Sequence, residues 1–336
     1  MNITLTDPTW TPRESSGKPL ALRFISDERD TPFLRLMFVL TLVMIPSAVW
    51  LYVDFNLYVA LARLVLVFWF LGPYILMLHN TSHRRLFKAP WTKLNYYIPW
   101  VLGPFFGETP ETYFAHHVGM HHPENNLEDD VSSTLPYRRD SAWGFLRYFL
   151  RFFFGVIFEL PRYFVKKRRK ALAIRSVGGE LVFLGVVTAL FFVSWKATLL
   201  VFIIPYVSTR LLMMCGNWGQ HAFVDKDSPE CEYRNSITCI NTGYNRRCFN
   251  DGYHIGHHIK QTRHWTEMPE DFQKNIATYA KERAIVFEGI DFFMVWCCLM
   301  LKRYDWLARK YVKLEGGPQT EEEIIALLKS RTQWSR

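Results

Sequence analysis

The chain has 336 residues, of which 49% are hydrophobic and 16% aromatic, and its formal net charge is +9. This apolar content provides enough surface for a large core, and the high aromatic content favours a membrane protein or one with an apolar pocket. The positive charge would suit a nucleic-acid binder, but the basic residues form no stripe with interleaved aromatics, so that class is excluded.

The N-terminal segment and the cysteines both indicate a cytosolic start. The first twenty residues are polar and contain no apolar h-region, so we expect no cleaved signal peptide. The six cysteines form neither a C-x-x-C pair nor a zinc-ribbon spacing, so we expect reduced thiols.

Four apolar stretches predict two transmembrane helical hairpins. Residues 36–53 carry no charge, and residues 57–78 follow after the short break DFN. Such runs are long enough to cross a hydrocarbon core of about 30 Å at about 1.5 Å per residue. Residues 181–195 and 197–215 repeat this plan on either side of Lys196. We expect Arg63, inside the second run, to snorkel back to the interface.

The basic residues predict the orientation of these spans. Many of them follow the second span or precede the third, whereas the two short opposite loops contain only Lys196. The positive-inside rule therefore predicts that both termini are cytosolic. The expected location is the endoplasmic reticulum in a eukaryote or the inner membrane in a bacterium.

Two further apolar stretches are poor spanning candidates. Residues 145–165 contain Arg147 and Arg151 on one helical face, which favours an amphipathic helix in the interface plane. Residues 285–301 contain two acidic residues, so we expect a packing helix, with a fifth span as the alternative. The predicted organisation is a cytosolic segment (1–32), a membrane domain (33–301) and a cytosolic tail (302–336).

Ten of the eleven histidines lie in four places, all on the predicted cytosolic side. Helical spacings of three or four residues bring imidazoles onto one face, where they can reach a shared ion. These histidines are His79 and His83; His116, His117, His121 and His122; His221; and His254, His257 and His258.

The number of imidazoles favours two metal ions. One zinc ion takes four ligands and an octahedral iron site six, so nine histidines exceed the needs of a single ion. His117 and His121 are interpreted as the pair at i and i+4 in the middle segment, with His116 undecided. Asn217, four residues before His221, is a candidate to orient a bound water. His264 stands apart and is expected to be a hydrogen-bonded residue rather than a ligand.

The chain resembles the membrane fatty acid desaturase and hydroxylase superfamily, whose signature is three histidine boxes. The boxes here are H-x3-H, H-x3-H-H and H-x2-H-H, and an N-x3-H element lies between the second and third. The resemblance implies an all-α membrane fold with a helical cytosolic cap and two iron ions that activate O2. It implies nine ligands: His79, His83, His117, His121, His122, His221, His254, His257 and His258. Candidate carboxylates that would fix their tautomers are Asp225, Asp251, Glu108 and Glu111.

The resemblance leaves the reaction open. The three-residue gap in the middle box and the N-x3-H element are similar to those of alkane monooxygenases, whereas four spans favour the acyl desaturases. We therefore expect a desaturase acting on a long-chain acyl or lipid substrate. The alternative is a monooxygenase of an alkyl, acyl or isoprenoid chain, and a metal transporter or receptor is less favoured because the spans offer no polar path.

The sequence contains no fused electron-donor motif. Neither H-P-G-G nor a G-x-G-x-x-G fingerprint is present, so electrons are expected from a separate b-type cytochrome, or a ferredoxin with its reductase. Basic residues such as Arg246 and Arg247 are candidates for docking that donor, or for contact with anionic lipid.

Overall fold

The computed structural model describes residues 3–11 and 20–333. The chain forms two compact units. The membrane unit comprises Thr11–Gly119 and Ile157–Leu211, and the C-terminal unit comprises Met1–Trp10, Met120–Val156 and Leu212–Arg336.

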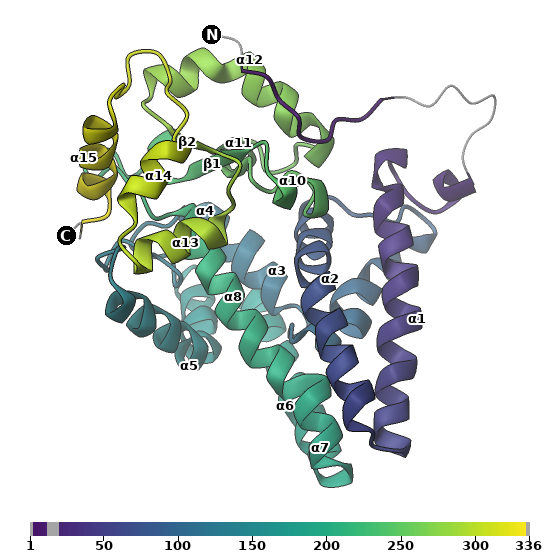
Figure 1. The fold of residues 1–336 in the computed structure, drawn as a ribbon. Coiled ribbons are helices and arrows are strands. Elements are labelled where there is room, and N and C mark those ends of the chain that lie inside the picture. Colours follow the sequence, from purple (N-terminus) through teal and green to yellow (C-terminus); the bar gives the residue numbers. More distant parts are fainter. Residues whose placement is uncertain (1–2, 12–19, 334–336) are drawn as a thin grey trace. The chain divides into compact units, whose positions relative to one another are not determined.

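The first hairpin of the membrane unit consists of α1 (Thr31–Val53) and α2 (Leu57–His83), which pack side by side (Figure 1). Asn56 starts α2, because its side chain accepts hydrogen bonds from the backbone N–H groups of Tyr58 and Val59. Helix α2 continues through the first histidine box, so His79 and His83 lie in its last turns.

The second hairpin consists of α6 (Lys170–Val193) and a helix built from α7 (Trp195–Thr198), the π-helical turn η7 (Leu199–Ile203) and α8 (Ile204–Gln220). Ser194 caps α7 through its side chain, and so provides the sharp connection.

The four long helices are those that the sequence predicts as spans. They are long and apolar enough to cross a membrane, and their bounds are Glu28–Val53, Leu57–His83, Lys170–Val193 and Trp195–Gln220. Their outer faces expose large apolar side chains, such as Phe38 on α1, Trp69 on α2 and Phe192 on α6. Exposed apolar surface of this extent marks lipid contact, and the protein is a multi-pass membrane protein.

Two arginines inside the spans, Arg63 and Arg210, are buried. The prediction that Arg63 snorkels to the interface is wrong: its side chain is only 2% exposed, and the guanidinium lies over the Phe105 ring at 5.4 Å. Arg210 is also buried, and it forms an ion pair with Glu180 of α6. Thr109 donates to the same carboxylate at 2.7 Å.

Short helical turns connect α2 to the second histidine box. Packing against α1 and α2 fixes several of them inside the membrane unit. In chain order they are η3 (Trp91–Tyr96), the π-helical turn η4 (Ile98–Leu102), η5 (Gly103–Phe106) and α3 (Thr112–His116). The turns η1 (Leu20–Arg23) and η2 (Glu28–Asp30) precede α1.

The amphipathic stretch at 145–165 forms a single helix, α5 (Ala142–Lys166). Phe145 and Tyr148 on one face are buried, whereas Leu146 and Arg147 are exposed. The helix is therefore confirmed, and its position in the interface plane stays a prediction.

The C-terminal unit contains a small sheet that the all-α expectation lacks. Strands β1 (Ile237–Ile240) and β2 (Ile285–Glu288) pair in parallel, with Ile237 opposite Ile285. Strand β1 is buried along its whole length, as is typical of a parallel strand. The run at 285–301 is thus divided between β2 and the nine-residue helix α13 (Phe292–Met300), which is too short to be a fifth span.

Two apolar clusters stabilise this unit. One joins β1 and β2 to α13 and includes Ile324 and Leu328 of the C-terminal helix. The other gathers Tyr253, Phe272 and neighbours against the sheet. The remaining elements are α4 (His122–Glu124), α9 (Glu232–Asn235), α10 (Gly243–Arg247), α11 (His254–Ile259), η8 (Trp265–Glu267), α12 (Met268–Lys281), α14 (Tyr304–Lys310) and α15 (Glu321–Arg331).

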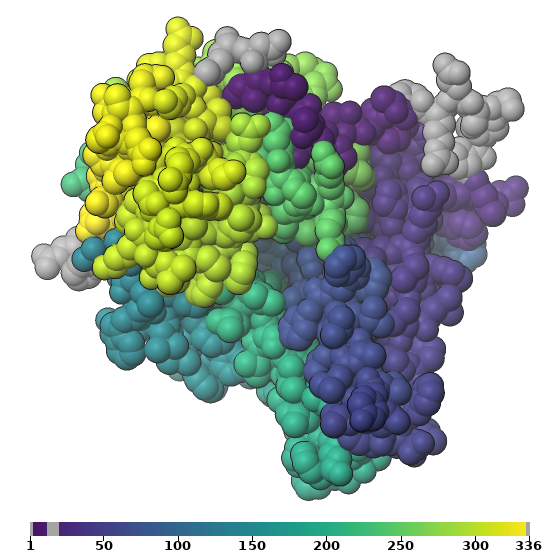
Figure 2. Space-filling view, viewed as in Figure 1, coloured from purple at the N-terminus to yellow at the C-terminus, as the bar shows by residue number. Residues whose placement is uncertain are grey.

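The N-terminal residues lie across the surface of the C-terminal unit, where they appear in dark purple in Figure 2. The Asp7 carboxylate accepts hydrogen bonds from the Tyr253 hydroxyl at 2.6 Å and from the Asn241 backbone N–H at 2.7 Å. Because Tyr253 precedes His254, this contact stabilises the start of the third histidine box.

Candidate metal centre

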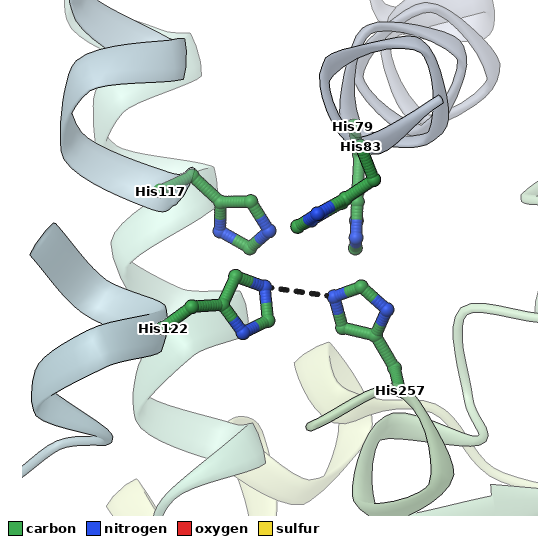
Figure 3. Close-up of side chains that lie close together, drawn as sticks. All are labelled: His79, His83, His117, His122 and His257. Carbon is green, nitrogen blue, oxygen red and sulfur yellow. Dashed lines mark hydrogen bonds between the residues drawn. The ribbon is translucent and has the colours of Figure 1, made fainter. Parts of the chain in front are cut away.

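Three histidines of the membrane unit form one cluster. His79 and His83 project from the last turns of α2, and their ring centroids lie 5.2 Å apart. The His117 ring lies 4.6 Å from that of His79 and 5.1 Å from that of His83. Figure 3 shows these three rings turned toward one another. Tyr113 stacks on the His117 ring at 5.2 Å and limits its rotation.

The second histidine box is a π-helical turn, η6 (His117–His121), rather than an α-helix. The sequence interpretation that His117 and His121 share a face as an i, i+4 pair is therefore wrong. In a π-helix the hydrogen bonds run from i to i+5, so the residue one turn after His117 is His122. The wider turn separates His121 from the face that carries His117.

Four histidines of the C-terminal unit form a second, fully buried cluster. Each offers a ring nitrogen within 4.8 Å of the others. The closest approach is between the Nε2 atoms of His221 and His254, at 3.3 Å. The members come from η6, the end of α8 and α11, and they are His121, His221, His254 and His258.

Hydrogen bonds on the outer ring nitrogens orient this cluster. The Nδ1 atom of His121 lies 2.7 Å from the Asp130 carboxylate, and that of His221 lies 3.0 Å from the Asn235 carbonyl oxygen. Each Nδ1 can donate only if it carries the proton, which leaves the Nε2 lone pair available to a metal. Glu232 lies 3.6 Å from the Nδ1 atom of His258, which is longer than a hydrogen bond.

Burial favours the neutral form, which binds metal, for two of these imidazoles, His221 and His254. Burial, followed by the neighbouring His121 ring, lowers the pKa of His221 to about 4. Burial and the surrounding rings, His258 first, lower the pKa of His254 well below its ordinary value. Imidazole nitrogen suits first-row metals such as iron, zinc and copper, so the donor set fits the iron that the resemblance implies.

The C-terminal unit also contains a close histidine pair. The Nε2 atoms of His122 and His257 lie 2.9 Å apart, as the dashed line in Figure 3 shows. His257 therefore points to a different partner from His254 and His258, although all three lie on the short helix α11.

Each carboxylate proposed from the sequence has a defined place in the structure. Asp225 pairs with Arg331, Asp251 accepts a hydrogen bond from the Tyr244 hydroxyl, and Glu111 pairs with Arg175. Glu108 is buried in the membrane unit, where burial raises its pKa to about 8.

Three other residues singled out in the sequence also have defined places. The Asn217 amide donates to the Ser132 carbonyl oxygen at 3.1 Å and to the Tyr148 hydroxyl at 2.6 Å. His264 is buried and caps η8 by accepting a hydrogen bond from the backbone N–H of Thr266. His116, at the end of α3, is not among the clustered histidines.

Sequence reasoning missed Asp130 and Asn235, which hold the rings of the buried cluster. Asp130 lies nine residues beyond His121, in a loop that it organises by accepting hydrogen bonds from the backbone N–H of Asn126 and Ser132. The only signal in the sequence is the polar stretch NNLEDDVSS after the second box. Such a stretch predicts a turn but does not say which carboxylate faces a histidine.

Four apolar spans and buried histidine clusters able to bind metal define a multi-pass membrane protein with the features of the histidine-box enzymes. The sequence matches the Fatty acid desaturase family over residues 55–289, and the chain belongs to that family. No curated protein and no solved structure was found to be similar to it.

Proposed function

We propose that the protein is a di-iron, O2-dependent desaturase that introduces a double bond into a long-chain fatty acyl or lipid substrate. The observation that carries the proposal is the buried cluster of four imidazoles, two of which have their Nδ1 atoms at hydrogen-bond distance from Asp130 and Asn235. Membership of the desaturase family supplies the reaction class.

The proposed ligands fall into two sets, one for each ion. The first ion would be held by His79, His83, His117, His122 and His257, and the second by His121, His221, His254 and His258. The backbone of the second histidine box favours this assignment of ligands to two ions. Its π-helical turn directs the neighbouring side chains of His121 and His122 to different sides. Bound iron would supply the O2 activation that removal of hydrogen from an unactivated C–H bond requires.

The chain's own residues would orient and protect this centre. Asp130 and Asn235 fix two rings, and burial of all four rings excludes bulk water from the ligands. The exposed apolar faces of α1, α2 and α6 would let a lipid substrate approach within the membrane.

The proposal includes a separate electron donor and cytosolic termini. The basic residues around the second and third spans support this orientation, and the absence of donor motifs in the sequence supports a cytochrome or ferredoxin partner. We also propose that the chain consists of a cytosolic N-terminal segment (1–32), a membrane domain (33–301) and a cytosolic C-terminal tail (302–336).

A monooxygenase that hydroxylates an alkyl, acyl or isoprenoid chain is the second candidate. The three residues between His117 and His121, together with the element from Asn217 to His221, favour it because alkane monooxygenases share both features.

Product analysis separates the two candidates. Membranes containing the protein, a reductant and a saturated acyl substrate should yield a product that has lost two hydrogens, as mass spectrometry would detect. A product that has gained one oxygen would establish the monooxygenase instead. Metal analysis of the purified protein should find about two irons per chain, and mostly zinc or no metal would contradict the di-iron proposal.

A further inference from the structure

Arg63 is a buried cation inside the membrane unit. It lies in α2, and its side chain is only 2% exposed. The guanidinium faces the Phe105 ring at 5.4 Å, and the surrounding cluster of side chains is apolar and includes Ala60 and Phe202. A charged group in such surroundings is costly unless an anion or hydrogen-bond acceptors accompany it.

Within the described residues, none of the three guanidinium nitrogens has a hydrogen-bond partner. Three carboxylates of this unit form ion pairs with other arginines: Glu180 pairs with Arg210, Glu111 pairs with Arg175, and Asp27 pairs with Arg29 and Arg84. Arg63 therefore differs from the other buried arginine of the spans, because Arg210 has its counter-ion within the chain.

The neighbouring hydroxyl groups do not complete a site by themselves. The Thr198 hydroxyl donates to the Ser194 carbonyl oxygen at 2.8 Å, so the Tyr52 hydroxyl donates to Thr198 across their 2.6 Å contact. The hydroxyl protons of Thr198 and Tyr52 are thus both donated to acceptors within the protein. Of these three side chains, only the Arg63 guanidinium can still donate hydrogen bonds to a ligand.

The backbone beside Arg63 is irregular. The π-helical turn η7 and the turn η5 both pack against α2, and Phe105 of η5 stacks on Phe202 of η7 at 5.6 Å. A π-helical turn inside a long helix is uncommon and is frequent at functional sites.

We propose that Arg63 binds the carboxylate of a long-chain fatty acid within the membrane unit. The planar guanidinium donates two parallel N–H groups, which match the two oxygens of a carboxylate. A single alkyl chain suits the apolar and aromatic side chains around the site. A large hydrated headgroup does not suit a side chain that is 2% exposed.

This site is separate from the histidines of the same helix. Arg63 and His79 are sixteen residues apart in α2, which corresponds to about 24 Å along the helix axis. Binding at Arg63 therefore needs no metal, and the proposal does not rest on the proposed function.

The test is binding of radiolabelled stearate to the iron-free full-length protein in a nonionic maltoside detergent. Wild-type protein should bind stearate saturably, and Arg63→Gln should weaken binding at least tenfold. The matched control is Lys196→Gln, because Lys196 is an exposed basic residue of α7 and lies over the Phe55 ring near the start of α2. This variant should bind stearate as the wild type does.

Competition on the wild-type protein gives a result that does not depend on a variant folding. Unlabelled stearate should displace the label, whereas octadecanol, sodium chloride and inorganic phosphate should not. Equal displacement by octadecanol would show that the alkyl chain alone binds, and displacement by chloride or phosphate would show a site for small anions. Either result, or undiminished binding to well-folded Arg63→Gln, would overturn the proposal.

Discussion

Asp130 fixes a candidate ligand ring from outside the histidine boxes. Its carboxylate lies 2.7 Å from the Nδ1 atom of His121 and also accepts hydrogen bonds from the loop around it. We expect Asp130→Asn to weaken metal binding by about 10–100-fold, since the amide can no longer hold the protonated Nδ1 as firmly. Iron titration of the purified apoprotein measures this. Glu128→Gln, a nearby exposed acid, is the control and should change little.

His121 and His264 are both buried but have different expected roles. His121→Ala should abolish turnover and reduce the iron content while the protein remains in the membrane. His264→Ala should retain iron and activity and lose about 1 kcal/mol of stability, because His264 caps η8. Iron analysis and thermal unfolding of both variants test this, and loss of iron from His264→Ala would show that the proposed ligand set is wrong.

We expect the stability of the folded protein to depend on pH because of the buried carboxyl group of Glu108. Burial raises its pKa to about 8 in the folded protein, although Arg210 opposes the shift, against about 4.5 in the unfolded chain. Between these values the folded state binds more protons than the unfolded state. The contribution of Glu108 to stability therefore falls as the pH rises, by up to about 1.4 kcal/mol per pH unit.

Glu108→Gln removes this titration. Thermal midpoints in detergent should agree for the wild type and the variant near pH 4.5. The wild type should become progressively less stable than the variant toward pH 8. Parallel pH profiles would contradict the assignment of a raised pKa to Glu108.

At the scale of elements, we expect alanine substitutions of two adjacent glycines in α6 to have opposite effects on stability. A Cβ atom on Gly179 would lie 1.5 Å from the backbone oxygen of Pro110, whereas one on Gly178 would meet nothing within 4 Å. Gly179→Ala would force α6 away from the segment that carries Thr109, whose hydroxyl bonds Glu180.

Gly179→Ala should therefore destabilise the protein by roughly 1–3 kcal/mol or more. Gly178→Ala should be neutral or stabilise it by up to about 1 kcal/mol, because alanine favours the helix. Thermal unfolding of the two variants in the same detergent compares them directly. Equal destabilisation would mean that α6 does not approach Pro110 as closely as the structure indicates.

At the scale of the whole molecule, the proposed orientation is testable by protease access. A C-terminal epitope tag should be digested only from the cytosolic face. A tag inserted at Ser194, between the third and fourth spans, should be digested only from the opposite face. Digestion of both tags from one face would contradict the paired-hairpin topology, which predicts an even number of crossings between the termini.

The sequence by itself determined the four spans and the histidine boxes. Long apolar runs and the spacing of His79 with His83 are local properties of one helix, and the structure confirms both. The short strands β1 and β2 could not be predicted in the same way, because their pairing joins residues some fifty positions apart.

Only the tertiary structure decided which groups each side chain meets. The π-helical turn separates His121 from the face of His117, and the loop after it brings Asp130 to the His121 ring. Arg63 was expected at the interface, yet the turns that pack against α2 bury it. Hydropathy and spacing describe one segment at a time, whereas burial and hydrogen bonding depend on which distant segments fold against it.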